Sequence, residues 1–165
     1  MGLLKSLFVL ASTGAAMVVG AGMARTLQTR RSPEQREFLS GRVPRELPDG
    51  FYEGSADFDT HSWKGKTFNA AESRGANVLE NDGARREEFP FRLSTGPGLQ
   101  DPAIEVLKID YDLPDNPCWL RFILDEVVEV DDGKLLGKIH LRVVPGLPFS
   151  VGYFRLEKVP VPAAA

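Results

Sequence analysis

An uncharged stretch of 19 residues near the amino terminus constrains this chain more than any other feature. It runs from Ser6 to Ala24 and reads SLFVLASTGAAMVVGAGMA. As an α-helix it would be about 28 Å long at roughly 1.5 Å per residue, close to the thickness of the hydrocarbon core of a bilayer. A helix that is apolar on every side needs apolar surroundings on every side, and one small domain offers too little of them. The stretch therefore predicts a membrane segment rather than a core helix.

Two kinds of membrane segment fit residues 1–31. Lys5 before the apolar run, and Gly22 and Ala24 at its end, are typical of a cleaved signal peptide. The run is longer than the roughly 7–15 residues of a signal-peptide core, which favours an uncleaved, single-pass membrane anchor. Cleavage near Ala24, giving a secreted or periplasmic protein, is the alternative.

Small side chains recur at every fourth position of this segment, at Ser12, Ala16, Gly20 and Ala24. On a helix these four positions lie on one face, where a second helix can approach closely. The spacing offers a face for a homodimer, and the competing interpretation is that Ala, Gly and Ser are simply frequent in weakly hydrophobic spans.

Charge separates the segment from the rest of the chain. Residues 1–31 hold four basic side chains and no acidic one, so the net charge of −3 leaves −7 on the remainder. An acidic domain argues against a nucleic-acid partner. The single cysteine, Cys118, and the two histidines, His61 and His140, argue against a disulfide framework and a metal site. We therefore predict no metal and no cofactor.

A short helix and a linker are predicted over residues 32–50. Ser32 is a typical N-cap, Pro33 fits the first helical position, and Gln35 would complete a capping box. The helix should reach Leu39, after which two glycines and two prolines prevent regular structure.

Residues 51–159 change to short β-rich runs separated by Gly, Pro, Asn and Asp, and residues 160–165 form a Pro/Ala tail that we expect to be disordered. The clearest unit is a hairpin of Arg121–Val130 and Lys134–Val144 around an Asp-Gly turn. Further strands are predicted at Ile104–Tyr111, Glu87–Leu93, Pro148–Lys158, Phe51–Ser55 and Lys66–Ala70. About seven antiparallel strands predict a mainly β fold, a closed barrel or, as the alternative, a sandwich.

A family resemblance favours the barrel. Trp63-Lys64-Gly65 resembles the G-x-W-x-G signature of lipocalin-like and fatty-acid-binding-like barrels, with His61 in place of the leading glycine. The later motifs are similar to small lipocalin-like domains of unknown function; they are Asp125-Glu126, Leu136-Gly137-Lys138 and the run Gly152–Leu156. The resemblance covers Phe51 to Lys158 and implies a cup for a small apolar or lipid-like ligand, with Trp63 closing one end against the final strand.

Polar side chains at alternate positions of the C-terminal strands are the candidates for ligand binding. Arg155 shares the register of Tyr153 and could bind an acidic head group. The same alternation also marks the solvated face of a half-buried strand, which is the competing interpretation. The candidate ligand-binding residues are Arg155, Tyr153, Arg142, His140, Asp125 and Trp63.

Three classes of function remain at this point. A membrane-tethered binding module for a small apolar ligand predicts an apolar cavity with few polar anchors. A structural or interaction domain predicts a barrel filled by its own side chains. An enzyme using carboxylate, tyrosine and lysine chemistry predicts titratable groups that converge in a pocket. The sequence favours binding, because its few histidines and single cysteine leave little acid–base equipment, and it identifies no catalytic residue.

The first prediction is that residues 6–24 hold the full-length chain in the membrane during alkaline carbonate washing, because a spanning helix is not released by loss of surface charge. Immunoblotting of the washed membranes measures this. Intact chain in the supernatant would contradict the anchor, and a mature protein beginning near Arg25 would support the signal peptide.

Overall fold

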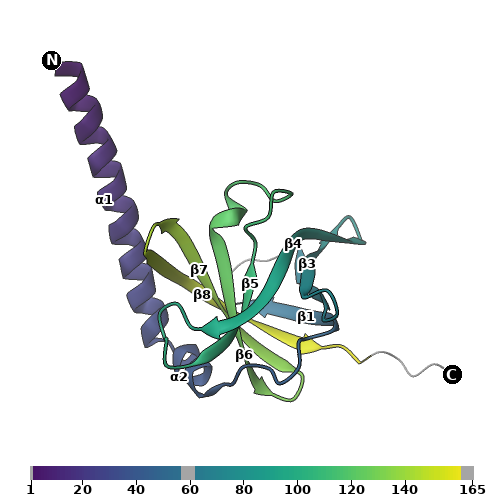
Figure 1. Ribbon diagram of the computed structural model, residues 1–165. Helices are drawn as coiled ribbons and strands as arrows, with labels where there is room; N and C mark the ends of the chain where they lie inside the picture. Colours follow the sequence, from purple (N-terminus) through teal and green to yellow (C-terminus); the bar gives the residue numbers. More distant parts are fainter. Residues whose placement is uncertain (1, 57–61, 161–165) are drawn as a thin grey trace.

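The computed structural model describes the backbone of residues 2–56 and 62–160 and the side chains of residues 17–56 and 62–160. Two helices precede an eight-stranded antiparallel sheet that closes into a barrel, in which each strand pairs with the next and β8 pairs with β1 (Figure 1). The elements are α1 (Gly2–Arg31), α2 (Pro33–Ser40), β1 (Gly50–Ala56), β2 (Trp63–Asn69), β3 (Arg74–Asn81), β4 (Ala84–Pro97), β5 (Glu105–Asp110), the 3₁₀ turn η1 (Leu120–Phe122), β6 (Ile123–Asp131), β7 (Lys134–Val144) and β8 (Leu147–Lys158). The mainly β barrel predicted from the sequence is confirmed, and the sandwich alternative is wrong.

Most strands lie where the pattern of residues placed them. The hairpin of β6 and β7 turns at Gly133, whose φ of 67° is the left-handed conformation that glycine allows. Strand β3 was not predicted, because its sequence RGANVLEN mixes small and polar residues without alternation. Strand β4 extends beyond the predicted Glu87–Leu93 at both ends.

The interior of the barrel is filled by the protein's own side chains. One contiguous cluster of buried residues occupies it, and its members are Tyr52, Phe68, Phe91, Leu93, Leu107, Ile109, Tyr111, Leu120, Val127, Leu135, Phe154 and Leu156. Aromatic rings meet edge to face, for example Phe91 and Tyr111 at 5.6 Å between ring centroids. The cluster is a packed core rather than an apolar hollow.

Helix α1 is attached to the outside of β8. The Arg25 Nε donates to the Val151 carbonyl at 2.7 Å, and the Ser150 N–H donates to Thr26 Oγ1 at 3.0 Å. Gly22 lies against the ring of Phe149, so close that a Cβ there would be 2.6 Å from it. From this attachment α1 continues beyond the end of the barrel (Figure 1).

Most described side chains of α1 are exposed, so residues 17–31 are not a core helix. No helix in the described part of the chain is both long enough and apolar enough to cross a bilayer. The side chains of residues 6–16 of the apolar stretch, including Ser12 and Ala16, lie outside the described residues, whereas Gly20 and Ala24 are exposed. The membrane segment and the homodimer stay predictions.

Helix α2 covers a second face of the barrel. Phe38 is completely buried in a separate cluster on the outside of the sheet, with Val106, Val128, Leu136 and Tyr153. Ser32 is the N-cap residue, but its side chain makes no capping hydrogen bond. The predicted capping box is therefore wrong, because Gln35 is buried against the sheet instead.

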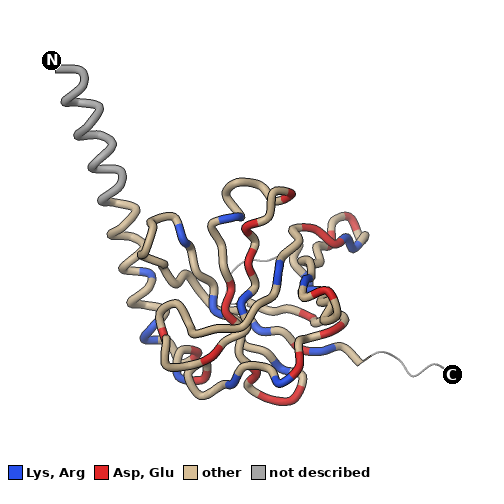
Figure 2. Tube along the Cα trace, in the orientation of Figure 1, with Lys and Arg blue, Asp and Glu red and all other residues tan. Residues whose placement is uncertain are grey.

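Charged residues are unevenly distributed among the turns (Figure 2). The β3–β4 hairpin is rich in acidic and basic side chains, whereas no charged residue lies between Arg142 and Arg155, the stretch that contains the β7–β8 turn. The surface of the barrel therefore has one turn that is apolar as well as uncharged.

The second prediction concerns Gly137, which lies opposite Phe154 in the β7–β8 pair. A Cβ at this position would be 2.1 Å from the Phe154 ring, so Gly137→Ala should lower the free energy of unfolding by about 1–3 kcal/mol through overpacking. Gly96→Ala is the matched control, because its nearest neighbour is 3.8 Å away. Equal unfolding midpoints in urea for the two variants would contradict the packing described here.

Candidate functional site

Four polar side chains, three from different strands and one from the residue that follows β5, meet inside the barrel. They are Lys66 on β2, Asn77 on β3, Tyr111 directly after β5 and Asp125 on β6, and each is at most 7% exposed. Buried charges are costly unless they are paired and hydrogen-bonded, so this cluster needs a structural or functional reason.

The Lys66 ammonium is at the centre of the cluster. Its Nζ donates to Asn77 Oδ1 at 2.8 Å and to the Tyr111 hydroxyl, and it lies 3.3 Å from Asp125 Oδ2. The Tyr111 hydroxyl donates to the same carboxylate oxygen at 3.2 Å. All three ammonium protons therefore have an acceptor.

Trp63 lies beside the cluster near the start of β2. Its Nε1 donates to Asn77 Oδ1 at 3.0 Å, and its ring meets Phe154 of the final strand edge to face at 5.8 Å. The indole is half-buried. The structure thus brings together two residues that the sequence singled out, Trp63 and Asp125, and packs Trp63 against the strand that the resemblance implied.

A β-bulge accompanies Asn77. The pairing of β3 with β4 shifts register between Ala76 and Asn77, and Phe89 on the facing strand has a φ of +57°. This conformation is strained for an aromatic residue, and the Phe89 carbonyl accepts a hydrogen bond from Asn77 Nδ2 at 3.5 Å. The bulge therefore lies at Asn77, whose side-chain amide oxygen accepts hydrogen bonds from both Trp63 and Lys66.

Burial shifts the protonation of the whole cluster toward neutral forms. It lowers the pKa of Lys66 and raises the pKa of Asp125, and in each case the charge of the partner opposes the shift. Burial and the Asp125 carboxylate together raise the pKa of the Tyr111 hydroxyl well above its usual value. Tyr111 therefore stays protonated and acts as a hydrogen-bond donor to Asp125.

Aromatic rings surround the Lys66 ammonium. The rings of Trp63, Phe91, Tyr111 and Phe154 have centroids between 5.1 and 5.6 Å from Nζ. Their faces attract a cation and replace part of the water that a buried ammonium loses.

One atom of the cluster lacks a partner. Asp125 Oδ1 is buried and accepts no hydrogen bond from the described residues. Its companion oxygen is held by Lys66 and Tyr111, so Oδ1 is the carboxylate oxygen of Asp125 that has no donor among the described residues.

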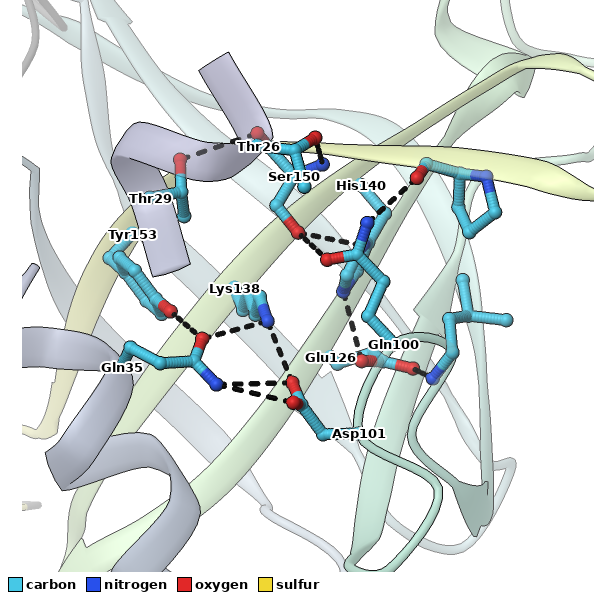
Figure 3. A network of polar contacts seen from close by, with 12 residues as sticks. Thr26, Thr29, Gln35, Gln100, Asp101, Glu126, Lys138, His140, Ser150 and Tyr153 are labelled. Carbon is cyan, nitrogen blue, oxygen red and sulfur yellow. Dashed lines mark hydrogen bonds and ion pairs between the residues drawn. The ribbon is translucent and has the colours of Figure 1, made fainter. Parts of the chain in front are cut away.

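A second polar group lies outside the barrel, beneath α2 (Figure 3). Lys138 Nζ donates to Gln35 Oε1 at 2.9 Å and to Asp101 Oδ2 at 2.8 Å, and the Tyr153 hydroxyl donates to the same Gln35 oxygen at 2.5 Å. Burial raises the pKa of Tyr153. Burial also acts to raise the pKa of Asp101, but its bonds to Lys138 and Gln35 outweigh this and leave it lowered. The group fixes α2 and residues 98–104 on the sheet.

His140 belongs to a neighbouring row of buried side chains (Figure 3). Its Nε2 lies 2.9 Å from Glu126 Oε2 and its Nδ1 lies 3.3 Å from Ser150 Oγ. Ser150 donates its hydroxyl proton to Gln100 at 2.6 Å, and Glu126 accepts from the Leu99 N–H. A serine held in this way is not directed at the histidine as a nucleophile would be.

The interpretation of Lys138 and His140 as a solvated face is wrong, because both are completely buried. Helix α2 and the 98–104 segment cover this face of β7. Its alternating polar side chains mark the surface on which these two elements pack. The pattern of one strand contains no information about what will cover it.

The two candidate arginines lie in other places. Arg155 and Tyr153 do share a face of β8, but it is the outer one. There Nη1 and Nη2 of Arg155 donate to the two Glu37 carboxylate oxygens at 2.8 and 2.6 Å. Arg142 binds Asp110 at 2.6 Å near the start of β6. The six candidates are thus divided between the barrel interior, the outer face near α2 and the end of the barrel where Arg142 binds Asp110.

Sequence reasoning missed Lys66, Asn77 and Tyr111. Lys66 lies on a strand that was predicted weakly, Asn77 on one that was not predicted, and Tyr111 at the end of the predicted strand Ile104–Tyr111. Strand pairing alone brings all three to Asp125. Within the described residues, no group of three or more histidine, cysteine, aspartate or glutamate side chains could hold a metal ion.

Comparison with known proteins gives information about the fold and about nothing else. No family model matches the chain, and no curated protein matches it. A solved structure described as "Crystal structure of protein from Thermomonospora curvata" is 17% identical, covers 91% of this chain and 99% of its own, and superposes with a TM-score of 0.54. The barrel is therefore a fold that occurs in another protein.

The third prediction tests the buried pair. Lys66→Met should lower the free energy of unfolding by about 3–5 kcal/mol, because it leaves Asp125 buried without its cation, and the double variant Lys66→Met/Asp125→Leu should recover much of this. Arg85→Met, which removes an exposed ion pair with Glu80, is the control and should cost less than about 1 kcal/mol. Equal losses for Lys66→Met and Arg85→Met in urea unfolding would refute the burial of the pair.

Proposed function

We propose that this protein is a membrane-tethered barrel that binds a small, largely apolar molecule through a hydrogen-bond-donating head group, at the end of the barrel where Trp63 lies. The observation that carries the proposal is the buried Asp125 Oδ1, an acceptor without a donor among the described residues. An unsatisfied buried acceptor costs about 1–3 kcal/mol, which a hydroxyl or amine of a ligand would recover.

The charges of the site favour a donor over an acid. Lys66 is already held by Asn77, Tyr111 and Asp125, so it has no proton left for a carboxylate. A carboxylate ligand would also approach the Asp125 carboxylate, and like charges at close range repel. The acidic head group expected at Arg155 would have to displace Glu37 on the outside of the sheet.

The apolar part of the ligand would lie at the mouth of the barrel, because side chains fill the interior. Trp63, Phe89 and Trp119 provide aromatic surface there, with the last two in contact at 6.2 Å between ring centroids. Flat rings of this kind suit a planar or short apolar body rather than a long acyl chain.

The contacts of α1 support an uncleaved tether. Cleavage near Ala24 would remove Gly22 from the ring of Phe149 and shorten the helix at the point where Arg25 and Thr26 bind β8. A helix that is built into the domain in this way has a structural use beyond targeting.

A structural or interaction domain is the second candidate, and the packed interior favours it. The Lys66–Asp125 pair favours binding instead, since apolar side chains could fill a purely structural barrel without the cost of burying charge. Ligand titration separates the two.

The fourth prediction is made for the full chain in lipid nanodiscs. We expect naphthalene-2-methanol to bind at least about tenfold more tightly than 2-naphthoic acid at pH 7, because only the alcohol donates to Asp125 and avoids repulsion. Calorimetry with empty nanodiscs as the reference measures both affinities. Arg155→Leu, on the outer face, should leave the preference unchanged.

Two results would overturn this function. Tighter binding of the acid, lost in Arg155→Leu, would return the head group to Arg155 as the sequence suggested. Binding of neither compound would support the structural domain.

A further inference from the structure

Four large apolar side chains are exposed together at one end of the barrel, and we call them the apical patch. They are Trp119, Phe122, Val143 and Leu147, with exposed fractions of 61%, 46%, 37% and 38%. Trp119 and Phe122 come from the segment between β5 and β6, and the other two from the strand ends on either side of the β7–β8 turn. Exposure of a tryptophan and a phenylalanine at the same end of the barrel is costly in water and indicates an interaction surface.

The apical patch lies at the end of the barrel beyond which the amino-terminal part of α1 extends. Gly22 of α1 lies beside Phe149, and Thr29 lies further along β8, where its hydroxyl is 3.3 Å from the Ser150 carbonyl. Toward its amino terminus α1 therefore runs past the β7–β8 turn, as Figure 1 shows. Helix and turn leave the barrel at the same end.

The C-terminal end of the apolar stretch of α1 overlaps the end of the barrel. Gly22 lies beside Phe149 of β8, and Leu147 is two residues nearer the turn than Phe149, about 7 Å at roughly 3.3 Å per residue. The β7–β8 turn thus lies alongside the stretch Ser6–Ala24 rather than below it. If this stretch crosses a bilayer, the turn must reach the lipid interface.

We propose that the apical patch docks on the lipid bilayer and holds this end of the barrel in the interfacial region. The proposal rests on the tether of the proposed function. It adds a second contact with the membrane, made by the folded domain itself, and it fixes which end of the barrel faces the lipid.

The composition of the apical patch fits a lipid surface. Tryptophan is enriched at the membrane interface, where its apolar ring and its N–H are both accommodated. The two arginines nearest to the patch, Arg121 and Arg142, are paired with Asp112 and Asp110. The local charge is therefore balanced, and we expect docking on zwitterionic lipid without a requirement for anionic lipid.

Docking would direct the mouth of the proposed site toward the membrane. Trp119 contacts Phe89, whose carbonyl binds Asn77, and Asn77 binds the Trp63 indole. This chain of contacts connects the apical patch to the buried cluster, so a molecule dissolved in the bilayer would meet the mouth first.

The chain carries a natural probe for this proposal. Cys118 is its single cysteine, is exposed, and precedes Trp119. A nitroxide spin label on Cys118 of the full chain, reconstituted in phosphatidylcholine vesicles, reports its surroundings through collisions with oxygen, which concentrates in lipid, and with a water-soluble nickel chelate. The matched control is the label at position 132 in the double variant Cys118→Ser/Asp132→Cys, in the exposed β6–β7 turn at the opposite end.

The fifth prediction is that the label on Cys118 collides preferentially with oxygen and the label at position 132 with the nickel chelate. Phe122→Ser/Leu147→Ser should raise nickel access at Cys118 at least about twofold. Chain that resists carbonate washing while both labels prefer nickel would overturn docking and leave the tether intact. Protection of Cys118 from both reagents would indicate a protein partner instead, and release of the chain by carbonate would overturn tether and docking together.

Discussion

The ion pair of Lys66 and Asp125 is the interaction on which the interior of this protein depends. Two charges taken out of water lose several kcal/mol of hydration each, and their mutual attraction repays this only when the geometry is good and further hydrogen bonds support the pair. Asn77, Tyr111 and four aromatic rings provide these contacts to the ammonium. A wide, water-filled cup could not provide them, so the pair and the packed aromatic core require each other.

A second constraint is that β7 is buried on both of its sides. Inside the barrel Gly137 yields its volume to the Phe154 ring, while outside it Lys138 is enclosed by Gln35 and Asp101. A strand covered on both faces normally has an almost continuous apolar sequence. Here the outer face is polar because what covers it is a helix and a loop that bind through side-chain hydrogen bonds.

These two constraints explain which features were predictable. The hairpin turn at Gly133 and the alternation of β7 are local, so the sequence was enough to find this hairpin and the mainly β class, whereas β3, which lacks alternation, was missed. The convergence of Lys66 with Asp125 depends on pairing around the closed barrel, and no local pattern contains it. The roles of Gln35 and Arg155 depend on where α2 packs, which is why one was expected to cap a helix and the other to bind a ligand.

The attachment of α1 changes what a membrane segment would mean for this domain. A glycine- and proline-containing linker after the segment would leave a barrel free to rotate below the bilayer. Arg25, Thr26 and Thr29 instead bind β8 before the linker begins, and Arg42 pairs with Glu129 within it. The direction of the helix is therefore fixed relative to the strands. Any surface that holds this helix also determines which end of the barrel it meets.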